Sequence, residues 1–185
     1  VRAYDRGHRA KASELQTTQR GTGCVGNCGR DNSGHGANGD SQTMTVIDAT
    51  TDAIGTQITL PSGPERALWD PFDDTIHQNL AAKNQQAVID PKTDTIKVVF
   101  NMPPGCTPKG AAINPTDQHI VIGCGGAMTV IMDGGNGANL AVSSNVGGSD
   151  AVAYNPVDNR FYTVSIRHKV AGNATPPLRV FAAAH

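Results

Sequence analysis

The chain has 185 residues, a formal net charge of −1 at pH 7 and a hydrophobic content of 38%. A nearly neutral chain has no electrostatic bias toward polyanions, so charge gives no support to a role on nucleic acids or acidic membranes. No apolar run approaches the roughly 18 residues of a membrane-spanning helix. The 21 glycines and 11 prolines predict short strands joined by many turns and argue against a helix bundle.

Residues 1–60 are expected to form a partial repeat unit with three strands, at about 1–5, 43–48 and 53–60. The stretch 6–42 is rich in Gly, Asn, Ser, Arg and His and shows no strand pattern, so it is predicted to be a long loop insertion. Alignment with the last unit makes 1–5 a second strand. This insertion and the one at 166–177 would then leave the same face of the domain, where ligands commonly bind.

From residue 43 onward the chain repeats with a period of about 42 residues. The dipeptide Val-Ile recurs at positions 46, 88 and 130, and the turn phrase Asn/Asp-Pro-x-Asp begins at positions 70, 114 and 155. Each period carries four short apolar stretches separated by turns, which is typical of one four-stranded β-propeller blade. Full units are expected at about 64–104 and 108–146, and a partial unit at 149–183. In the second full unit the predicted strands are about 109–114, 119–123, 128–132 and 138–143.

These phrases, with Pro-x-Gly, resemble the YVTN-type β-propeller repeats of secreted bacterial and archaeal proteins. The stretch 147–162, with Cys106 and Cys124 bracketing an inner hairpin, is similar to a YncE-like secreted subgroup. The resemblance covers about residues 43–183 and implies an all-β propeller. A closed ring of six to eight blades needs roughly 250–340 residues at this period, so the 185-residue domain is expected to be part of a larger ring completed by further chain. Such propellers are binding scaffolds, surface proteins and, more rarely, enzymes.

Four other positions predict local structure. Asp48, Asp90 and Asp133 recur near strand ends, where an aspartate commonly seeds an Asx turn, with calcium binding as the alternative. His77 aligns with strand positions of the other units and is expected to be a packed, hydrogen-bonded residue.

The four cysteines predict disulfides. Cys106 and Cys124 are symmetric about Pro115 in a hairpin turn, so they should lie opposite each other on neighbouring strands, within reach of a disulfide. Two buried free thiols are the alternative. Cys24 and Cys28 favour a small-loop disulfide. An even number of cysteines in such a chain indicates an oxidising compartment, so the protein is predicted to be secreted or periplasmic.

The candidate ligand-binding residues come from aligning the innermost strands. Glu65, Lys109 and Asp150 fall at one equivalent position, at the mouth of the predicted central channel. Charges of both signs around one opening could orient a polar ligand, and Arg66 adds a bidentate donor for a carboxylate or phosphate. The alternative is that these positions are simply solvated.

A metal site is a weaker hypothesis. His8, His35 and His168 lie on loops assigned to the same face and could bring a divalent metal to Glu65 or Asp150, although exposed loop histidines are the simpler interpretation. No cofactor is predicted, and no nucleophile motif or carboxylate pair indicates catalysis. The sequence therefore favours a scaffold that binds a small molecule or a protein. The alternatives are a metal-assisted, lactonase-like hydrolase and a subunit of a periplasmic redox assembly.

Overall fold

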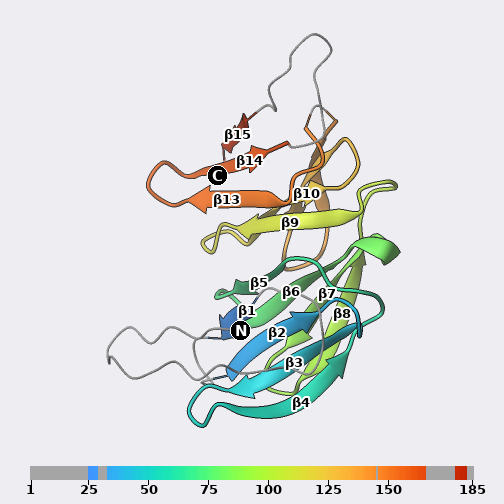
Figure 1. Cartoon of the computed structure of the whole chain (residues 1–185). Coiled ribbons are helices and arrows are strands. Elements are labelled where there is room, and N and C mark those ends of the chain that lie inside the picture. Colours follow the sequence, from blue (N-terminus) through green and yellow to red (C-terminus); the bar gives the residue numbers. More distant parts are fainter. Residues whose placement is uncertain (1–24, 29–32, 145, 166–177, 183–185) are drawn as a thin grey trace.

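The computed structural model describes residues 25–28, 33–144, 146–165 and 178–182. The fold is all-β, with four antiparallel sheets (Figure 1). The first sheet contains β1 (Val25–Cys28), β2 (Ser33–Asn38), β3 (Thr43–Asp48) and β4 (Ala53–Thr59). The second contains β5 (Ala67–Asp70), β6 (Thr75–Leu80), β7 (Gln85–Asp90) and β8 (Thr95–Asn101), with a 3-10 turn, η1 (Ala81–Lys83), between β6 and β7. The third contains β9 (Pro108–Ile113), β10 (His119–Cys124), β11 (Thr129–Asp133) and β12 (Asn139–Ser143), and the fourth contains β13 (Ala151–Asn155), β14 (Arg160–Val164) and β15 (Leu178–Ala182).

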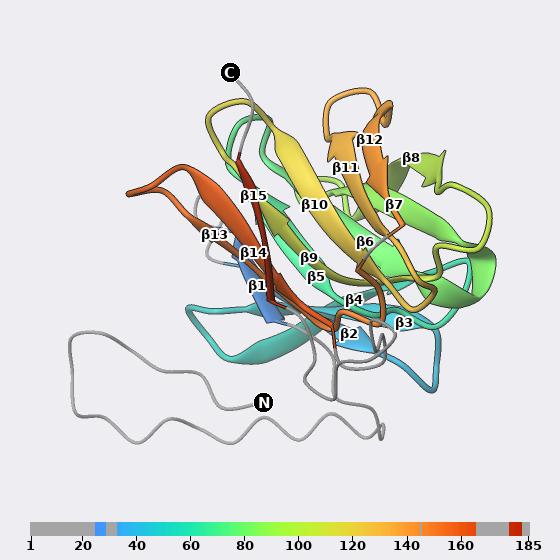
Figure 2. The same cartoon turned by 90° about the horizontal axis from the view of Figure 1, so that it is seen from above.

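Within every sheet the strands lie in chain order, so each sheet is a meander of neighbouring hairpins. The first strands of successive sheets lie next to one another: β1 beside β5, β5 beside β9, and β9 beside β13 (Figure 2). The starts of these first strands are therefore brought together although they lie about forty residues apart in the chain.

The turns between strands are built from short polar side chains. Asp70 Oδ1 accepts a hydrogen bond from the Phe72 N–H (2.8 Å), and Asp133 Oδ1 accepts one from the Gly135 N–H (2.8 Å). The same contact, from an Asx side chain to the N–H two residues on, occurs at Asp48, Asp90, Asn114 and Asn155. The Asx turns predicted at Asp48, Asp90 and Asp133 are thus confirmed. Five of these turns end on a non-glycine residue with φ between 53° and 59°: Asp52, Asp74, Asp94, Gln118 and Asn159. Four of the five are Asp or Asn, which tolerate this conformation better than other non-glycine residues.

Replacing Asp133 by alanine is expected to lower the free energy of unfolding by about 1 kcal/mol, the usual cost of losing a side-chain cap on backbone N–H groups. Asp133 accepts hydrogen bonds from the backbone of Gly135 and Asn136 and from the Asn136 side chain. The urea midpoint would measure the loss. The variant Asp133→Asn keeps an acceptor oxygen and should lose less than half as much, whereas an equal loss in both variants would contradict the turn's role.

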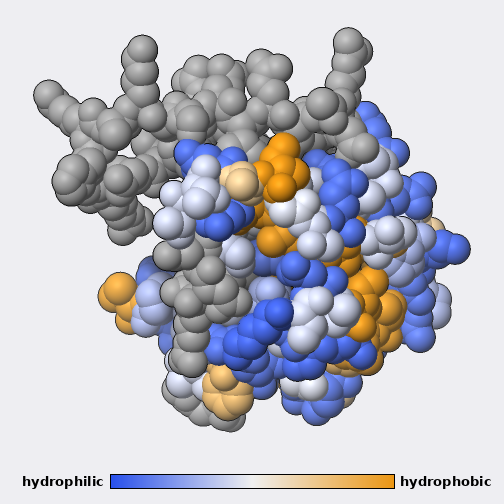
Figure 3. Space-filling model, turned by 90° about the horizontal axis from the view of Figure 1, so that it is seen from below, coloured by the Kyte–Doolittle hydropathy of each residue, from blue (hydrophilic) through white to orange (hydrophobic). Residues whose placement is uncertain are grey.

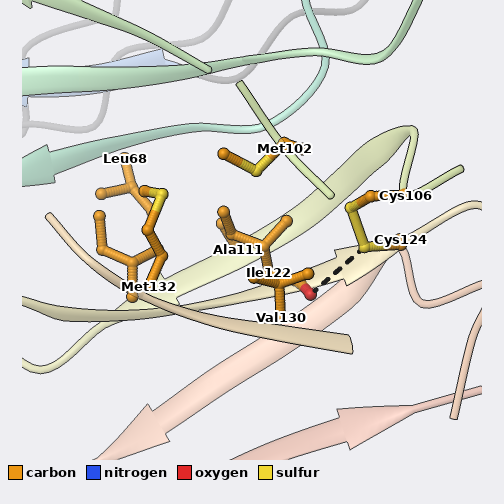
Figure 4. Close-up of a cluster of buried hydrophobic side chains, with 9 residues drawn as sticks. Leu68, Met102, Cys106, Ala111, Ile122, Cys124, Val130 and Met132 are labelled. Carbon is orange, nitrogen blue, oxygen red and sulfur yellow. Dashed lines mark hydrogen bonds between the residues drawn. A yellow bond between two sulfur atoms is a disulfide. The ribbon is translucent and has the colours of Figure 1, made fainter. Parts of the chain in front are cut away.

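Apolar layers fill the spaces between successive sheets. Alternation along each strand sends neighbouring side chains to opposite layers. On β10, for example, Ile120 and Ile122 pack toward the second sheet and Val121 toward the fourth. The layer between the second and third sheets is closed at one end by the disulfide between Cys106 and Cys124 (Figure 4). Outside these layers the surface is mainly polar, interrupted by a few hydrophobic patches on the face that Figure 3 shows.

The first sheet differs from the sequence prediction. Two strands, β1 and β2, lie within 6–42, which was predicted to be a loop. β2 reads Ser-Gly-His-Gly-Ala-Asn, without the apolar alternation of a typical strand, yet it pairs with β1 and β3 on its two edges. Pairing in the sheet therefore overrides its weak strand propensity. The second strand of this unit is β2, not residues 1–5, which lie outside the described part of the chain.

The other strand predictions agree with the structure. The predicted strands 43–48 and 53–60 correspond to β3 and β4, and the four strands of the third sheet lie within one residue of their predicted bounds. The described residues form fifteen strands. Among the described residues, no helix is long and apolar enough to cross a membrane.

Candidate binding site at the starts of the first strands

The predicted site residues lie at the starts of β5, β9 and β13. Lys109 Nζ donates to Glu65 Oε1, and this ion pair joins the second and third sheets. Both side chains are about one-third exposed (33% and 36%), so the charges remain accessible to solvent. Arg66 is exposed next to Glu65, and Asp150 is exposed at the start of β13. The structure therefore joins Glu65 and Lys109 in an ion pair and places Arg66 and Asp150, both exposed, at the starts of first strands.

Buried amide side chains donate hydrogen bonds to the backbone of the two residues that form this ion pair. Gln78 Nε2 donates to the carbonyl oxygens of Glu65 (3.0 Å) and Asn79 (3.0 Å). Asn79 Nδ2 donates to the carbonyl oxygen of Lys109 (2.9 Å), across the gap between the two sheets. Gln78 and Asn79 are both fully buried, so these hydrogen bonds are shielded from competing water. The positions of Glu65 and Lys109 are consequently set by groups inside the fold.

A chain of buried polar contacts continues from Asn79 to the far end of β5. Gln86 Nε2 donates to Asn79 Oδ1 (2.9 Å), so the Gln86 oxygen faces His77. His77 Nδ1 lies 2.9 Å from that oxygen and therefore carries the proton that it donates. On the other side of the ring, His77 Nε2 lies 3.7 Å from Asp70 Oδ2. All four side chains are fully buried, which confirms the expectation of a packed, hydrogen-bonded His77.

Asp70 lies at the end of this series of polar contacts, as a carboxylate. Burial raises the pKa of Asp70, but the nearby His77 ring and hydrogen bonds from the Phe72 N–H and from Gln118 outweigh burial and hold the pKa below its usual value. Gln118 Nε2 donates to Asp70 Oδ2 (2.8 Å) from the turn between β9 and β10. The polar chain therefore links the second and third sheets at the turns as well as at the site.

Close backbone contact positions Asp150 against the third sheet. The Gly110 N–H, which directly follows Lys109, donates to the Ser149 carbonyl oxygen (3.2 Å). A Cβ atom on Gly110 would lie 2.5 Å from the Asp150 carbonyl oxygen, and one on Gly123 would lie 2.3 Å from that of Ser149. Only glycine permits this approach. The start of β13 is thereby held beside Lys109.

The disulfide supports the same region. Cys106 and Cys124 are fully buried with Cα atoms 4.7 Å apart, in agreement with the predicted pairing. The Cys124 carbonyl oxygen accepts a hydrogen bond from the Gly148 N–H (2.7 Å), which ties the disulfide to the segment that leads into β13. For the second predicted pair, Cys24 and the side chain of Cys28 lie outside the described part of the chain.

The histidines proposed for a metal do not form a site within the described residues. His35 lies in β2, not on a loop, and is fully buried, with Nε2 3.6 Å from Asp94 Oδ1. His8 and His168 lie outside the described residues. No group of three or more His, Cys, Asp or Glu side chains suited to a metal ion occurs in the described ranges.

Sequence reasoning missed Gln78, Asn79 and Gln86, which support the site. The available signal was local: β6 carries His77, Gln78 and Asn79 in succession, where a strand buried on both faces usually reads as an apolar run. Three consecutive polar residues in such a strand indicate a buried polar network, because each must find a partner inside the fold.

Comparison with known proteins identifies a similar fold. No family model matches the chain, and no curated protein matches it. A solved structure of hydrazine synthase from Kuenenia stuttgartiensis, a protein with β-propeller domains, superposes with a TM-score of 0.74 at 16% sequence identity. The match covers 97% of this chain and 49% of that chain, so this chain spans about half the length of the hydrazine synthase chain. At this identity the likeness shows the fold alone.

Proposed function

We propose that the chain is part of a β-propeller that serves as a scaffold for binding a polar small molecule or a protein, at the starts of its first strands. The observation that carries this proposal is the Glu65–Lys109 ion pair. It is partly exposed, bridges two sheets, and rests on backbone fixed by the buried side chains of Gln78 and Asn79. Pre-positioned charges of both signs are what a polar ligand needs for recognition at low entropic cost.

The propeller assignment is supported by three observations. Each sheet is a meander, the first strands lie side by side, and the sequence repeats with a period of about 42 residues. The likeness to a protein with β-propeller domains agrees with them. The repeat phrases favour the YVTN type. A disulfide fits an oxidising environment, which supports a secreted or periplasmic location.

The binding proposal predicts which residues a small charged molecule contacts when it binds. Succinate, putrescine and the dipeptide Lys-Glu would be titrated separately into ¹⁵N-labelled protein. We expect at least one probe, and the dipeptide above all, to shift the amide signals of Glu65, Arg66, Lys109 and Asp150. The double variant Glu65→Gln/Lys109→Gln should weaken that binding about thirtyfold, because the two lost charge-assisted contacts contribute on the order of 1 kcal/mol each.

The matched control removes another ion pair. Lys92 Nζ lies 3.6 Å from Asp74 Oδ2, between two turns of the second sheet. The variant Lys92→Gln/Asp74→Asn loses the same charges and should bind the probe like the wild type. Binding that is equally weak in both double variants, or no shift near Glu65 with any probe, would refute the proposed site.

A further inference from the structure

The fourth sheet has one packed face and one exposed apolar face. Its packed face contains Val152, Tyr154, Phe161 and Phe181, which contact the third sheet. The opposite face carries the row of paired residues Ala153–Tyr162–Val180 and, next to it, the pair Ala151–Val164. The side chains of Val164 and Val180 are 40% and 47% exposed, and Ala151 and Ala153 are exposed as well.

The same row is covered in the two preceding sheets. In the second sheet it is Leu68–His77–Val88, which is buried beneath the third sheet. In the third sheet it is Ala112–Val121–Ile131, which packs against the fourth sheet. Each sheet thus uses this row as its contact with the next one, and the fourth sheet presents the equivalent row to solvent.

From this continuity we infer that, in the complete protein, a fifth antiparallel sheet of the same repeat, carried by the same polypeptide, packs on the Ala153–Tyr162–Val180 face. Ala153 is as small as its equivalent Ala112, so a sheet can approach as closely here as the fourth sheet approaches the third. The solved structure of similar fold has a chain about twice as long, which leaves room for such a sheet.

This inference rests on the repeat fold proposed above and does not depend on the ligand-binding site. It makes the exposed face an interface within one molecule. A second copy of the 185-residue chain covering the same face is the competing arrangement.

The test compares thiol accessibility in two lengths of the protein. The variant Val180→Cys would be prepared in the 185-residue chain and in the product of the complete gene. Labelling with iodoacetamide would be followed by mass spectrometry of the peptide that contains position 180. We expect labelling at position 180 to be at least tenfold slower in the complete product. Val142→Cys is the control, because Val142 is similarly exposed (51%) on β12 of a sheet that already has neighbours on both faces, and its rate should not change.

Three results would overturn the inference. The first is a complete gene product no longer than 185 residues. The second is equal labelling at position 180 in both lengths of the protein. The third is slow labelling in the 185-residue chain together with a mass of twice 19.3 kDa by light scattering. The last would mean that a second copy covers the face. Titrating the Lys-Glu dipeptide into both lengths separates the two proposals, because a failed binding site leaves the labelling result unaffected.

Discussion

Replacing His77 by leucine is expected to lower the free energy of unfolding by about 3 kcal/mol, the upper end of the cost of leaving a buried polar group without its hydrogen-bond partner. The substitution leaves the buried Asp70 carboxylate without its imidazole neighbour and the Gln86 oxygen without its donor. Leucine fills most of the volume of the ring, so the loss reports on polar contacts more than on a cavity. Urea unfolding at pH 7, with an unchanged dependence on denaturant, would measure it.

A matched control lies at the start of β10 in the third sheet. His119 Nδ1 lies 3.2 Å from Asp117 Oδ2, but both side chains are partly exposed. Exposed ion pairs contribute about 0–1 kcal/mol, so His119→Leu should cost less than about 1 kcal/mol. Similar losses in His77→Leu and His119→Leu would show that burial of the first pair has no energetic consequence and would contradict the interpretation.

The dependence of stability on pH gives a second readout for the same pair. The pKa of Asp70 is lower in the folded protein than in the unfolded chain, because the nearby His77 ring and hydrogen bonds from the Phe72 N–H and from Gln118 outweigh burial. Stability from this carboxylate is therefore fully present above the unfolded pKa and is lost as the pH falls through the folded pKa. Asp70→Asn should flatten the loss of stability below about pH 4. A purely steric role for residue 70 would leave that slope unchanged.

The fold could be predicted where local rules agree with the final structure. The third sheet was placed within one residue because apolar alternation, the Asn114-Pro115 turn and the 42-residue period all indicate the same strands. The strands β1 and β2 were missed because nothing in a Gly- and Asn-rich stretch signals a strand until its neighbours supply the pairing. Propensity is a weak guide when tertiary contacts decide.

The candidate site was predictable only in its outer residues. Repeat alignment brings Glu65 and Lys109 to equivalent positions, and the structure joins them in an ion pair. The contacts of Asn79 with Lys109 and of Gln86 with Asn79 depend on how two sheets pack and on the strand register. A repeat pattern shows that two positions are equivalent but not which side chains meet across a layer.

Removing the disulfide with the double variant Cys106→Ala/Cys124→Ala is expected to lower the free energy of unfolding by about 3 kcal/mol, the entropic value for a closed loop of this size. The two cysteines are 18 residues apart and fully buried, so alanine avoids burying an unpaired hydroxyl. Adding reductant should lower the urea midpoint of the wild type to about that of the variant. The midpoint of the variant itself should change much less.

The consequence should extend to the binding site. The Cys124 carbonyl oxygen accepts the Gly148 N–H two residues before Asp150, so a looser hairpin end allows the start of β13 to move relative to Lys109. Weaker binding of the Lys-Glu dipeptide is therefore expected in the cysteine variant, at a temperature where it remains folded. If reductant shifts the midpoint of the variant as far as that of the wild type, another cysteine pair carries the stabilisation. Unchanged dipeptide binding would mean that the site is held by the buried amides and glycine contacts alone.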